Sequence, residues 1–429
     1  MTATSCDRIS VCLVAYDSLP VFDSSVRRGF GGIETESVLI ARELARDDRF
    51  DVSLMVRHTH RSQVAELDGV RIITRVEPFL RIREAVSSCV TITRNWPWIR
   101  IEKFNPGLLW QIPLLAATWP FRRRDPNPFA PDPFFVAADI DVFFCFGASS
   151  LTASIASSVS GQILCLASDT DIDARIGPQS DWVNDYGESG RVCYHALTGA
   201  NQIIAQTTRQ QRQLKERFDL DSEVVSKLFN LEDWDRRLAS PPTFAYPDDW
   251  ESYVIWLGRA DTFHKRPLLL LELAKRLNDI RFLVILNPSD LDVEREFRAN
   301  CPENVRIIER VAFDELPDVY RRAAMYVSTS SRDFEGFPNV LVQAAATSIP
   351  IVSLEVDPGF VQEQGCGTVA DGDMDRLAQS VRSCWDDRSL AREYGKRGRQ
   401  YVEANHREAA FVDRVASYIL NVVAEKRAR

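Results

Sequence analysis

The chain has 429 residues, of which 45% are hydrophobic and 26% are charged, a composition typical of a globular protein. Because a single hydrophobic core rarely grows beyond about 250–300 residues, this length predicts two domains. The net charge of −9 argues against a general nucleic-acid binder, so no nucleic-acid partner is expected.

The nine cysteines are scattered and form no Cys-x-x-Cys pair. An odd number without a framework indicates reduced, buried thiols in a cytoplasmic protein. The first apolar run, residues 11–16, is short and has no cleavage-site pattern, so no signal peptide is expected. No stretch predicts a bilayer-spanning helix. With five histidines in all, a histidine-based metal site is not expected.

Short β-rich runs alternate with helical patterns along almost the whole chain, which predicts βαβ units and parallel sheets. We therefore expect an α/β protein with two Rossmann-like, doubly wound domains that face a central cleft. The predicted strands are residues 9–16, 51–56, 70–75, 141–147, 162–167, 201–206 and 223–228 in the first half, and 253–258, 281–286, 305–309, 325–330 and 351–354 in the second.

Two adjacent glycines, Gly31 and Gly32, follow the first predicted strand and open a helix. Paired glycines allow a backbone to approach a ligand closely, and the helix N-terminus behind them favours phosphate. Their spacing does not match the G-x-G-x-x-G dinucleotide fingerprint, which argues against a nicotinamide oxidoreductase.

The segment at about 94–135 interrupts the alternation of strands and helices. Between 94 and 124 it holds four tryptophans, four prolines and a closing run of three arginines. Aromatic residues beside cations suit a membrane interface or an acceptor-binding loop, so peripheral membrane contact through residues 94–124 is one interpretation. The other is an insertion packed on the first domain, with its tryptophans in the core.

Asp169 and Asp171 follow the predicted strand 162–167. Two close carboxylates can hold Mg²⁺ or Mn²⁺, so a metal site is one reading of this pair. The others are that Asp169 lines the acceptor side of the cleft or is a plain loop acid. No metal site is among our predictions.

Three prolines cluster in the polar stretch 238–249, which makes it the best linker candidate. We therefore predict domains at 1–238 and 239–404. The helix at 405–429 carries an apolar stripe that must be buried: Phe411, Val415, Tyr418, Ile419 and Val422.

The strand predicted at 253–258 ends in Gly258 and Arg259, and Lys265 lies six residues later at the start of a helix. Two cations on one loop at a helix N-terminus can clamp a diphosphate, because arginine forks onto phosphate oxygens and lysine supplies a point charge. A pair of solvated loop cations is the alternative.

The sequence Glu-Gly-Phe-Pro-Asn-Val-Leu-Val-Gln at residues 335–343 follows the strand predicted at 325–330. Pro338 can occupy the first position of the helix expected at 340–348, since no N–H is needed there. In open α/β sheets, ligands bind at the carboxyl ends of the strands, where this loop lies.

These elements, in this order, resemble the retaining glycosyltransferases of family 4 (glycosyl transferases group 1), which have the GT-B fold. The matching elements are Gly31-Gly32-x-Glu34, then Gly258-Arg259 with Lys265, and then Glu335 with Gln343, at the spacing of an E-x(7)-E signature. Gln343 departs from it, because an amide replaces the second acid.

The resemblance implies that the first domain binds the acceptor and the second binds a nucleotide diphosphate sugar, while the tail helix crosses back to the first domain. It implies a catalytic role for Glu335, Arg259 and Lys265, with Glu335 positioning the sugar. The implied donor-binding residues are Gly32, Gly258, Arg259, Lys265, Glu335, Gly336, Phe337, Asn339, Val340 and Gln343, and Asp169 is placed on the acceptor side.

The activity implied is that of a metal-independent, retaining hexosyltransferase without a cofactor. It would move a sugar to a hydroxyl of a glycan or a lipid-linked acceptor in polysaccharide biosynthesis, in the cytoplasm or at the inner face of the membrane. The alternatives are a nucleotide-sugar epimerase and, because of Gln343, a non-catalytic nucleotide-sugar-binding protein.

Overall fold

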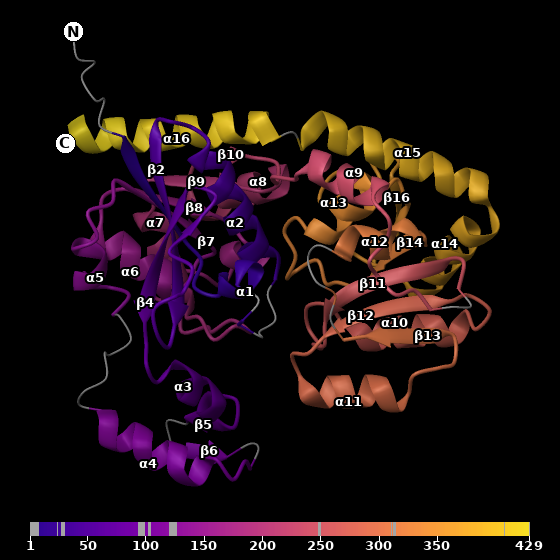
Figure 1. Ribbon diagram of the computed structural model, residues 1–429, viewed down its shortest axis with the longest axis horizontal. Coiled ribbons are helices and arrows are strands. Elements are labelled where there is room, and N and C mark those ends of the chain that lie inside the picture. The colour runs from indigo at the N-terminus through magenta and orange to yellow at the C-terminus, as the bar shows by residue number, and fades with distance from the viewer. Residues whose placement is uncertain are drawn as a thin grey trace.

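A computed structural model of the chain describes residues 8–23, 25–26, 31–92, 99–101, 104–119, 127–247, 250–309, 311, 315–406 and 408–428. Two lobes lie side by side, each built on a sheet with helices around it (Figure 1). The first sheet has eight strands in the order β10-β9-β8-β7-β1-β2-β4-β3, and the second has six in the order β13-β12-β11-β14-β15-β16. The α/β prediction with two doubly wound sheets is confirmed.

The first sheet is parallel except at the β3–β4 edge. Its strands are β1 (Ile9–Val14), β2 (Phe50–His58), β3 (Glu66–Leu67), β4 (Val70–Val76), β7 (Val142–Phe146), β8 (Gln162–Cys165), β9 (Gln202–Ala205) and β10 (Glu223–Val224). The helices before β10 are α1 (Leu19–Phe22), α2 (Gly32–Ala45), α3 (Leu80–Ser87), α4 (Leu108–Thr118), α5 (Pro133–Val136), α6 (Ser150–Ser158), the 3-10 turn η2 (Asp169–Ile172), α7 (Gly190–Gly199) and α8 (Thr208–Phe218).

The second sheet is parallel throughout. Its strands are β11 (Tyr253–Arg259), β12 (Phe282–Asn287), β13 (Val305–Ile308), β14 (Ala323–Ser328), β15 (Ile351–Ser353) and β16 (Gly367–Val369). The helices that follow β10 are α9 (Leu231–Ala239), α10 (Pro267–Arg276), α11 (Leu291–Ala299), α12 (Leu316–Arg321), α13 (Asn339–Ala346), α14 (Met374–Asp386), α15 (Arg388–Asn405) and α16 (Glu408–Ala428).

Each sheet reverses its winding at one point. In the first sheet β1 lies between β2 and β7, and in the second β11 lies between β12 and β14. At such a point the connections leave on opposite faces, so a crevice opens beyond the carboxyl ends of the two central strands. The loops after β11 and β14 therefore face one crevice.

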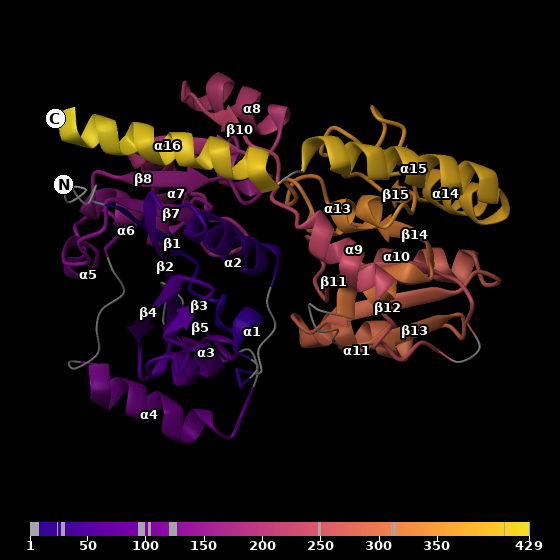
Figure 2. The same cartoon turned by 45° about the horizontal axis from the view of Figure 1, so that its top comes forward.

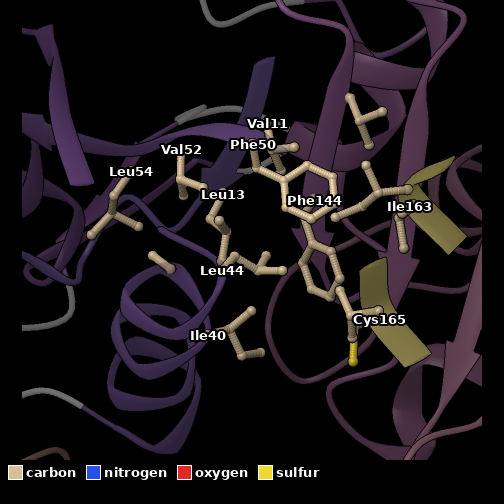
Figure 3. Close-up of a cluster of buried hydrophobic side chains, with 14 of the residues drawn as sticks. Val11, Leu13, Ile40, Leu44, Phe50, Val52, Leu54, Phe144, Ile163 and Cys165 are labelled. Atoms are coloured by element: carbon tan, nitrogen blue, oxygen red, sulfur yellow. The ribbon is translucent and has the colours of Figure 1, made fainter. Parts of the chain in front are cut away.

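The core of the first lobe forms between the sheet and α2. Figure 3 shows Leu13 of β1 and Phe144 of β7 pointing toward Ile40 and Leu44 of α2, and all four are at most 1% exposed. The apolar side chains of α2 recur at three-and-four spacing, so one face of the helix covers the sheet. This packing fixes where the Gly31-Gly32 turn lies relative to β1.

The chain passes between the lobes twice. Leu228 packs in the first core, whereas Phe229 and Trp234 pack in the second. We therefore place the first crossing at residues 228–229, earlier than the predicted boundary after residue 238.

The second crossing follows α15, at His406. Helix α16 returns to the first core through Phe411, Val415, Ile419 and Val422 among others, and it lies along one side of the first lobe, as α15 does along the second (Figures 1 and 2). The Nδ1 atom of His406 lies 2.8 Å from the carbonyl oxygen of Lys227, so the two crossings are adjacent. Burial lowers the pKa of His406 to about 4.

The packing of α16 predicts that substitutions at two neighbouring residues will lower the free energy of unfolding by very different amounts. Ile419 is 0% exposed, whereas Leu420 is 36% exposed. We expect Ile419→Ala to lower the free energy of unfolding by about 2–5 kcal/mol through the cavity it leaves. The matched control Leu420→Ala should stay within about 0.5 kcal/mol of the wild type. Urea unfolding would check this, and equal costs would show that α16 is not part of the first core.

Candidate active site

The site is built from the two loops that face the crevice of the second sheet. The loop after β11 carries Arg259, His264 and Lys265, and the loop after β14 carries Glu335. Although they lie up to 76 residues apart in the sequence, all four side chains meet at one point, as the following contacts show.

The centre of the site is a buried carboxylate. Glu335 is 8% exposed, and its Oε1 contacts the Nζ atom of Lys265 directly. The same oxygen lies 2.9 Å from Nε2 of His264. A carboxylate removed from water requires such partners, because an unpaired buried charge is strongly destabilising.

His264 links the carboxylate to the arginine. Arg259 Nη2 lies 3.0 Å from Nδ1 of His264, and the hydroxyl of Tyr186 lies 3.4 Å from the same atom. A guanidinium can only donate, so Nδ1 is the acceptor and the ring proton of neutral His264 is on Nε2, facing Glu335. The chain Arg259–His264–Glu335–Lys265 is therefore continuous.

The electrostatics of the site keep Glu335 ionised. Burial alone would raise the pKa of its carboxyl, but the charge of Lys265 and the contacts with Lys265 and His264 outweigh burial and hold that pKa well below its ordinary value of 4.5. Burial raises the pKa of Tyr186 to about 12, so its phenol stays protonated and can donate at neutral pH.

Two residues outside the predicted set, Asp261 and Thr329, shape the cation loop together with the predicted Gly258. Asp261 is 4% exposed, and its Oδ1 accepts the backbone N–H groups of His264 at 2.8 Å and of Lys265 at 2.6 Å. Thr329 donates its hydroxyl to the carbonyl oxygen of Lys265 at 2.7 Å. A Cβ at Gly258 would lie 3.1 Å from Cβ of Lys265 and closer still to Trp256, so a glycine there lets the loop fold back onto its strand.

The Gly-Phe turn after Glu335 lies against the first lobe. A Cβ at Gly336 would lie 2.6 Å from the Nε2 atom of Gln210, so only a glycine fits there without a shift. The backbone N–H of Phe337 donates to Oε1 of Gln206 at 3.2 Å. The amide expected to bind the donor is thus engaged by the other lobe, and a ligand there would have to displace Gln206.

Helix α13 starts at Asn339, next to Pro338. Pro338 is its N-cap, with extended backbone, rather than its first residue. The N–H groups of Asn339 and Val340 lie in the first helical turn, where no intrahelical partner exists. The side chain of Asn339 donates to the carbonyl oxygen of Gly32 at 3.2 Å, which brings the two predicted elements together across the lobes.

Gln343 is 8% exposed, and its Oε1 accepts the hydroxyl of Tyr320 at 3.2 Å. With the amide oxygen engaged by Tyr320, the group of Gln343 left for a ligand is the Nε2 donor. Gln343 and Asn339 line an interlobe cavity of about 510 Å³ that extends to Thr35 and Glu36 of α2. Arg259, Lys265 and Glu335 are not part of its lining.

Asp169 and Asp171 have different partners. Asp171 accepts the backbone N–H groups of Ala148 and Ala167 at 2.9 Å and 2.7 Å, which makes it a structural acid. Asp169 contacts Arg209 and accepts Nε2 of Gln210 at 3.0 Å. It therefore lies on the face of the first lobe that meets Gly336, close to where the acceptor side was predicted.

The sequence analysis assigned no role to Tyr186, Gln206, Gln210 or His264. Asp261 offered a local signal, since an aspartate three and four residues before two loop amides can cap them. The contacts of Tyr186 with His264 and of Gln206 with Phe337 join residues from opposite lobes, and no short-range pattern encodes them.

Comparison with known proteins identifies the second lobe. Residues 251–387 match the family model described as glycosyl transferases group 1. A GDP-mannose-dependent alpha-(1-6)-phosphatidylinositol monomannoside mannosyltransferase of Mycobacterium tuberculosis is 26% identical over 155 residues. That match covers 34% of this chain and 40% of the relative.

Solved structures match over nearly the whole chain. Sucrose-phosphate synthase of Thermosynechococcus elongatus aligns with a TM-score of 0.66 and 15% identity, covering 97% of this chain and 100% of that one. The Anabaena protein HepE, solved in complex with UDP-glucose, aligns with a TM-score of 0.60 and 11% identity over 96% and 100% of the two chains. The fold is therefore GT-B, as predicted.

The depressed pKa of Glu335 predicts a pH dependence of stability. A carboxyl whose pKa is lower in the folded than in the unfolded state stabilises the fold above its unfolded pKa, here about 4.5, and this contribution is lost as the pH falls below it. We expect Glu335→Gln to lose about 1–3 kcal/mol at neutral pH, because Lys265 loses a charged acceptor. The difference from the wild type should shrink in acid. Urea titrations at several pH values would measure it, and parallel curves would contradict the pairing.

Proposed function

We propose that the chain is a glycosyltransferase that moves a sugar from a nucleotide diphosphate sugar to a hydroxyl group. One observation carries the proposal: Arg259 and Lys265 converge with buried Glu335 at the crevice of a glycosyl transferases group 1 domain. Both cations come from one loop, and the carboxylate comes from the strand on the other side of the reversal. This arrangement suits a sugar bound beside a diphosphate.

The proposed division of labour follows from charge and position. Arg259 is 44% exposed and can turn to the diphosphate, where a guanidinium forks onto two oxygens. Lys265 neutralises the leaving group from the other side, and Glu335 accepts hydroxyls of the sugar. The N–H groups of Asn339 and Val340 and the turn at Gly32 add helix-terminal donors.

The reaction breaks the bond between the anomeric carbon and the diphosphate oxygen and forms one from that carbon to the acceptor oxygen. In the retaining course, the acceptor attacks from the face that the diphosphate leaves, and a phosphate oxygen takes the hydroxyl proton. Cations fixed before the reaction stabilise the charge that develops on the diphosphate. No protein nucleophile is needed, and we propose that no metal is required.

The donor and acceptor classes follow from the related proteins as proposals. HepE was solved with UDP-glucose, and the mycobacterial relative is described as acting on a phosphatidylinositol mannoside with GDP-mannose. We propose a hexose donor of this kind and a glycan or lipid-linked acceptor in polysaccharide synthesis. The cavity of about 510 Å³ beside Asn339 and Gln343 has room for the nucleoside end. The eight described cysteines are free thiols, which suits a cytoplasmic location.

The clamp predicts that Arg259→Ala lowers turnover by about 10²–10³-fold, the effect of removing one preorganised charge donor. Arg295→Ala serves as the matched control, because this arginine is 75% exposed on α11, outside the site. Donor binding would first be found by thermal shift against UDP-, GDP- and ADP-sugars. Transfer would then be followed by mass spectrometry of a glycan extract. Wild-type rates in Arg259→Ala would refute the clamp.

The same thermal-shift assay tests metal independence. We expect equal shifts with and without EDTA, since Arg259 and Lys265 are proposed to supply the positive charge. Loss of the shift in EDTA, with recovery on adding Mg²⁺ or Mn²⁺, would show that a cation takes part in donor binding.

The proposed contact between Gln343 and the ribose predicts that a substitution at this residue changes the binding affinity only of ligands that contain a ribose. We expect Gln343→Glu to bind a nucleoside diphosphate up to about tenfold more tightly, because a carboxylate accepts a ribose hydroxyl as a charged partner. Inorganic pyrophosphate lacks the ribose and should bind both proteins equally. Calorimetric titration would measure both ligands. An equal change for pyrophosphate, or no change for either, would place the ribose elsewhere.

One observation favours the epimerase alternative. Epimerisation needs acid and base groups at the sugar, and the structure brings His264 to 2.9 Å from Glu335. An epimerase would convert a nucleotide sugar without an acceptor, which NMR of the isolated donor would detect. A glycosyltransferase leaves the donor's ring configuration unchanged in that experiment.

A further inference from the structure

Helix α4 presents an apolar face to solvent. Its exposed positions are Leu109, Trp110, Pro113, Ala116 and Ala117, which recur at helical spacing and include no polar side chain. Leu109 is 72% and Trp110 is 55% exposed. On an ordinary surface helix, the outward stripe is charged or polar. The interpretation that the tryptophans of this segment form core is therefore wrong for Trp110.

The apolar surface extends beyond the helix. Five of the eleven large hydrophobic side chains exposed in the described part of the chain lie between residues 101 and 119. Ile101 is 52%, Phe104 is 70% and Trp119 is 66% exposed. Scattered exposed hydrophobics need no explanation, but their concentration in one short segment is typical of an interaction surface. We call these five side chains, with Leu109 and Trp110 among them, the α4 platform.

The charges around the platform in the sequence are opposite to those of the whole chain. Residues 104–119 contain no charged side chain at all. Residues 94–124 contain six lysines and arginines and one acid, whereas the whole chain carries −9. The flanking cations, including the run 122–124, and Trp96 and Trp98 lie outside the part whose side chains are described. An uncharged aromatic helix between two cationic segments matches the chemistry of an anionic lipid surface.

The platform lies beyond the carboxyl end of β4 in the first sheet (Figure 1). Helix α3 follows the carboxyl end of β4, and α4 extends beyond it, away from α16 (Figures 1 and 2). Parallel strands share their carboxyl edge, so the turn at Gly31 after β1 and the turn at Asp169 after β8 lie along the same edge. A surface held at the platform therefore faces the side that carries the proposed acceptor site.

We propose that the α4 platform docks the first lobe on an anionic lipid bilayer, with Trp110 and Leu109 in the interface. A helix of 11 residues is about 16 Å long, half of the roughly 30 Å hydrocarbon core, so α4 lies in the interface rather than crossing it. Among the described residues, no helix meets the length and apolarity needed for a membrane span. Docking would present a lipid-linked hydroxyl to the cleft. The presentation of a lipid-linked acceptor rests on the proposed glycosyl transfer, whereas the docking on a bilayer does not.

Co-sedimentation of the full chain with vesicles tests the proposal. One set of vesicles contains phosphatidylcholine alone, and the other contains phosphatidylcholine with phosphatidylglycerol. We expect binding to the anionic vesicles that weakens with salt, and at least tenfold weaker binding by Leu109→Ser/Trp110→Ser. The control Leu291→Ser removes a side chain that is 56% exposed on α11 of the other lobe, and it should bind as the wild type does.

A second measurement separates insertion from attraction by charge alone. Lipids brominated in the acyl chain should quench part of the wild-type tryptophan fluorescence, and Trp110→Phe should remove most of that quenching. Equal vesicle binding by the double variant would overturn the proposal. So would a dimer of the wild type that dissociates in the double variant, because a second copy would then cover the platform. The thermal shift with nucleotide sugars should be unchanged in the double variant, so failure of docking and failure of donor binding are distinguishable.

Discussion

The ion pair between Glu335 and Lys265 is the interaction on which the rest of the site depends. The carboxylate is buried between two loops that approach each other only because β11 and β14 are neighbours at the reversal of the second sheet. Burying it costs free energy that its cationic partners must offset. Asp261 and Gly258 hold the cation loop in place for that pairing, so the site is a property of the sheet topology as much as of the charged residues.

The same pairing shapes how a ligand can enter. The proposed diphosphate would bring negative charge to a place where Lys265 is already neutralised by Glu335 and Arg259 already donates to His264. Binding therefore exchanges contacts within the protein for contacts with the ligand. The interlobe contacts of Phe337 and Asn339 belong to this set too, since both involve groups expected to bind the donor. In this structure, these groups are therefore engaged in contacts within the protein.

Much of this could be predicted from the sequence because it is encoded locally. All twelve predicted strands exist, since runs of β-branched residues between turns are a short-range signal. The strands that were missed, such as β16 with three residues, are too short to show a period. The convergence of Glu335 with Lys265 followed from motif order. The role of His264 did not, because its partners Tyr186 and Glu335 are brought to it by tertiary structure.

Helix α4 shows a different limit of sequence analysis. A helix that is apolar on all sides is normally buried, and the sequence left a core position for its tryptophans open beside membrane contact. Hydrophobic periodicity cannot distinguish a helix that is buried in protein from one whose outer face contacts a lipid bilayer, because both helices lack a polar stripe. Only the exposed fractions of Leu109 and Trp110 distinguish the two. The position of the first crossing between the lobes is likewise shown by where Trp234 packs. The amino-acid composition of a linker does not reveal that packing.

The contact between Lys227 and His406 has a mechanical consequence. Two connections that run next to each other act as one hinge, whose axis passes through both. Such a hinge resists twisting and sliding of one lobe relative to the other but permits the two lobes to rotate apart. Substrate entry and product release would then depend on a single angle between the two lobes. Ordering or loosening of the backbone at Lys227 and His406 would set how far the cleft between them can open.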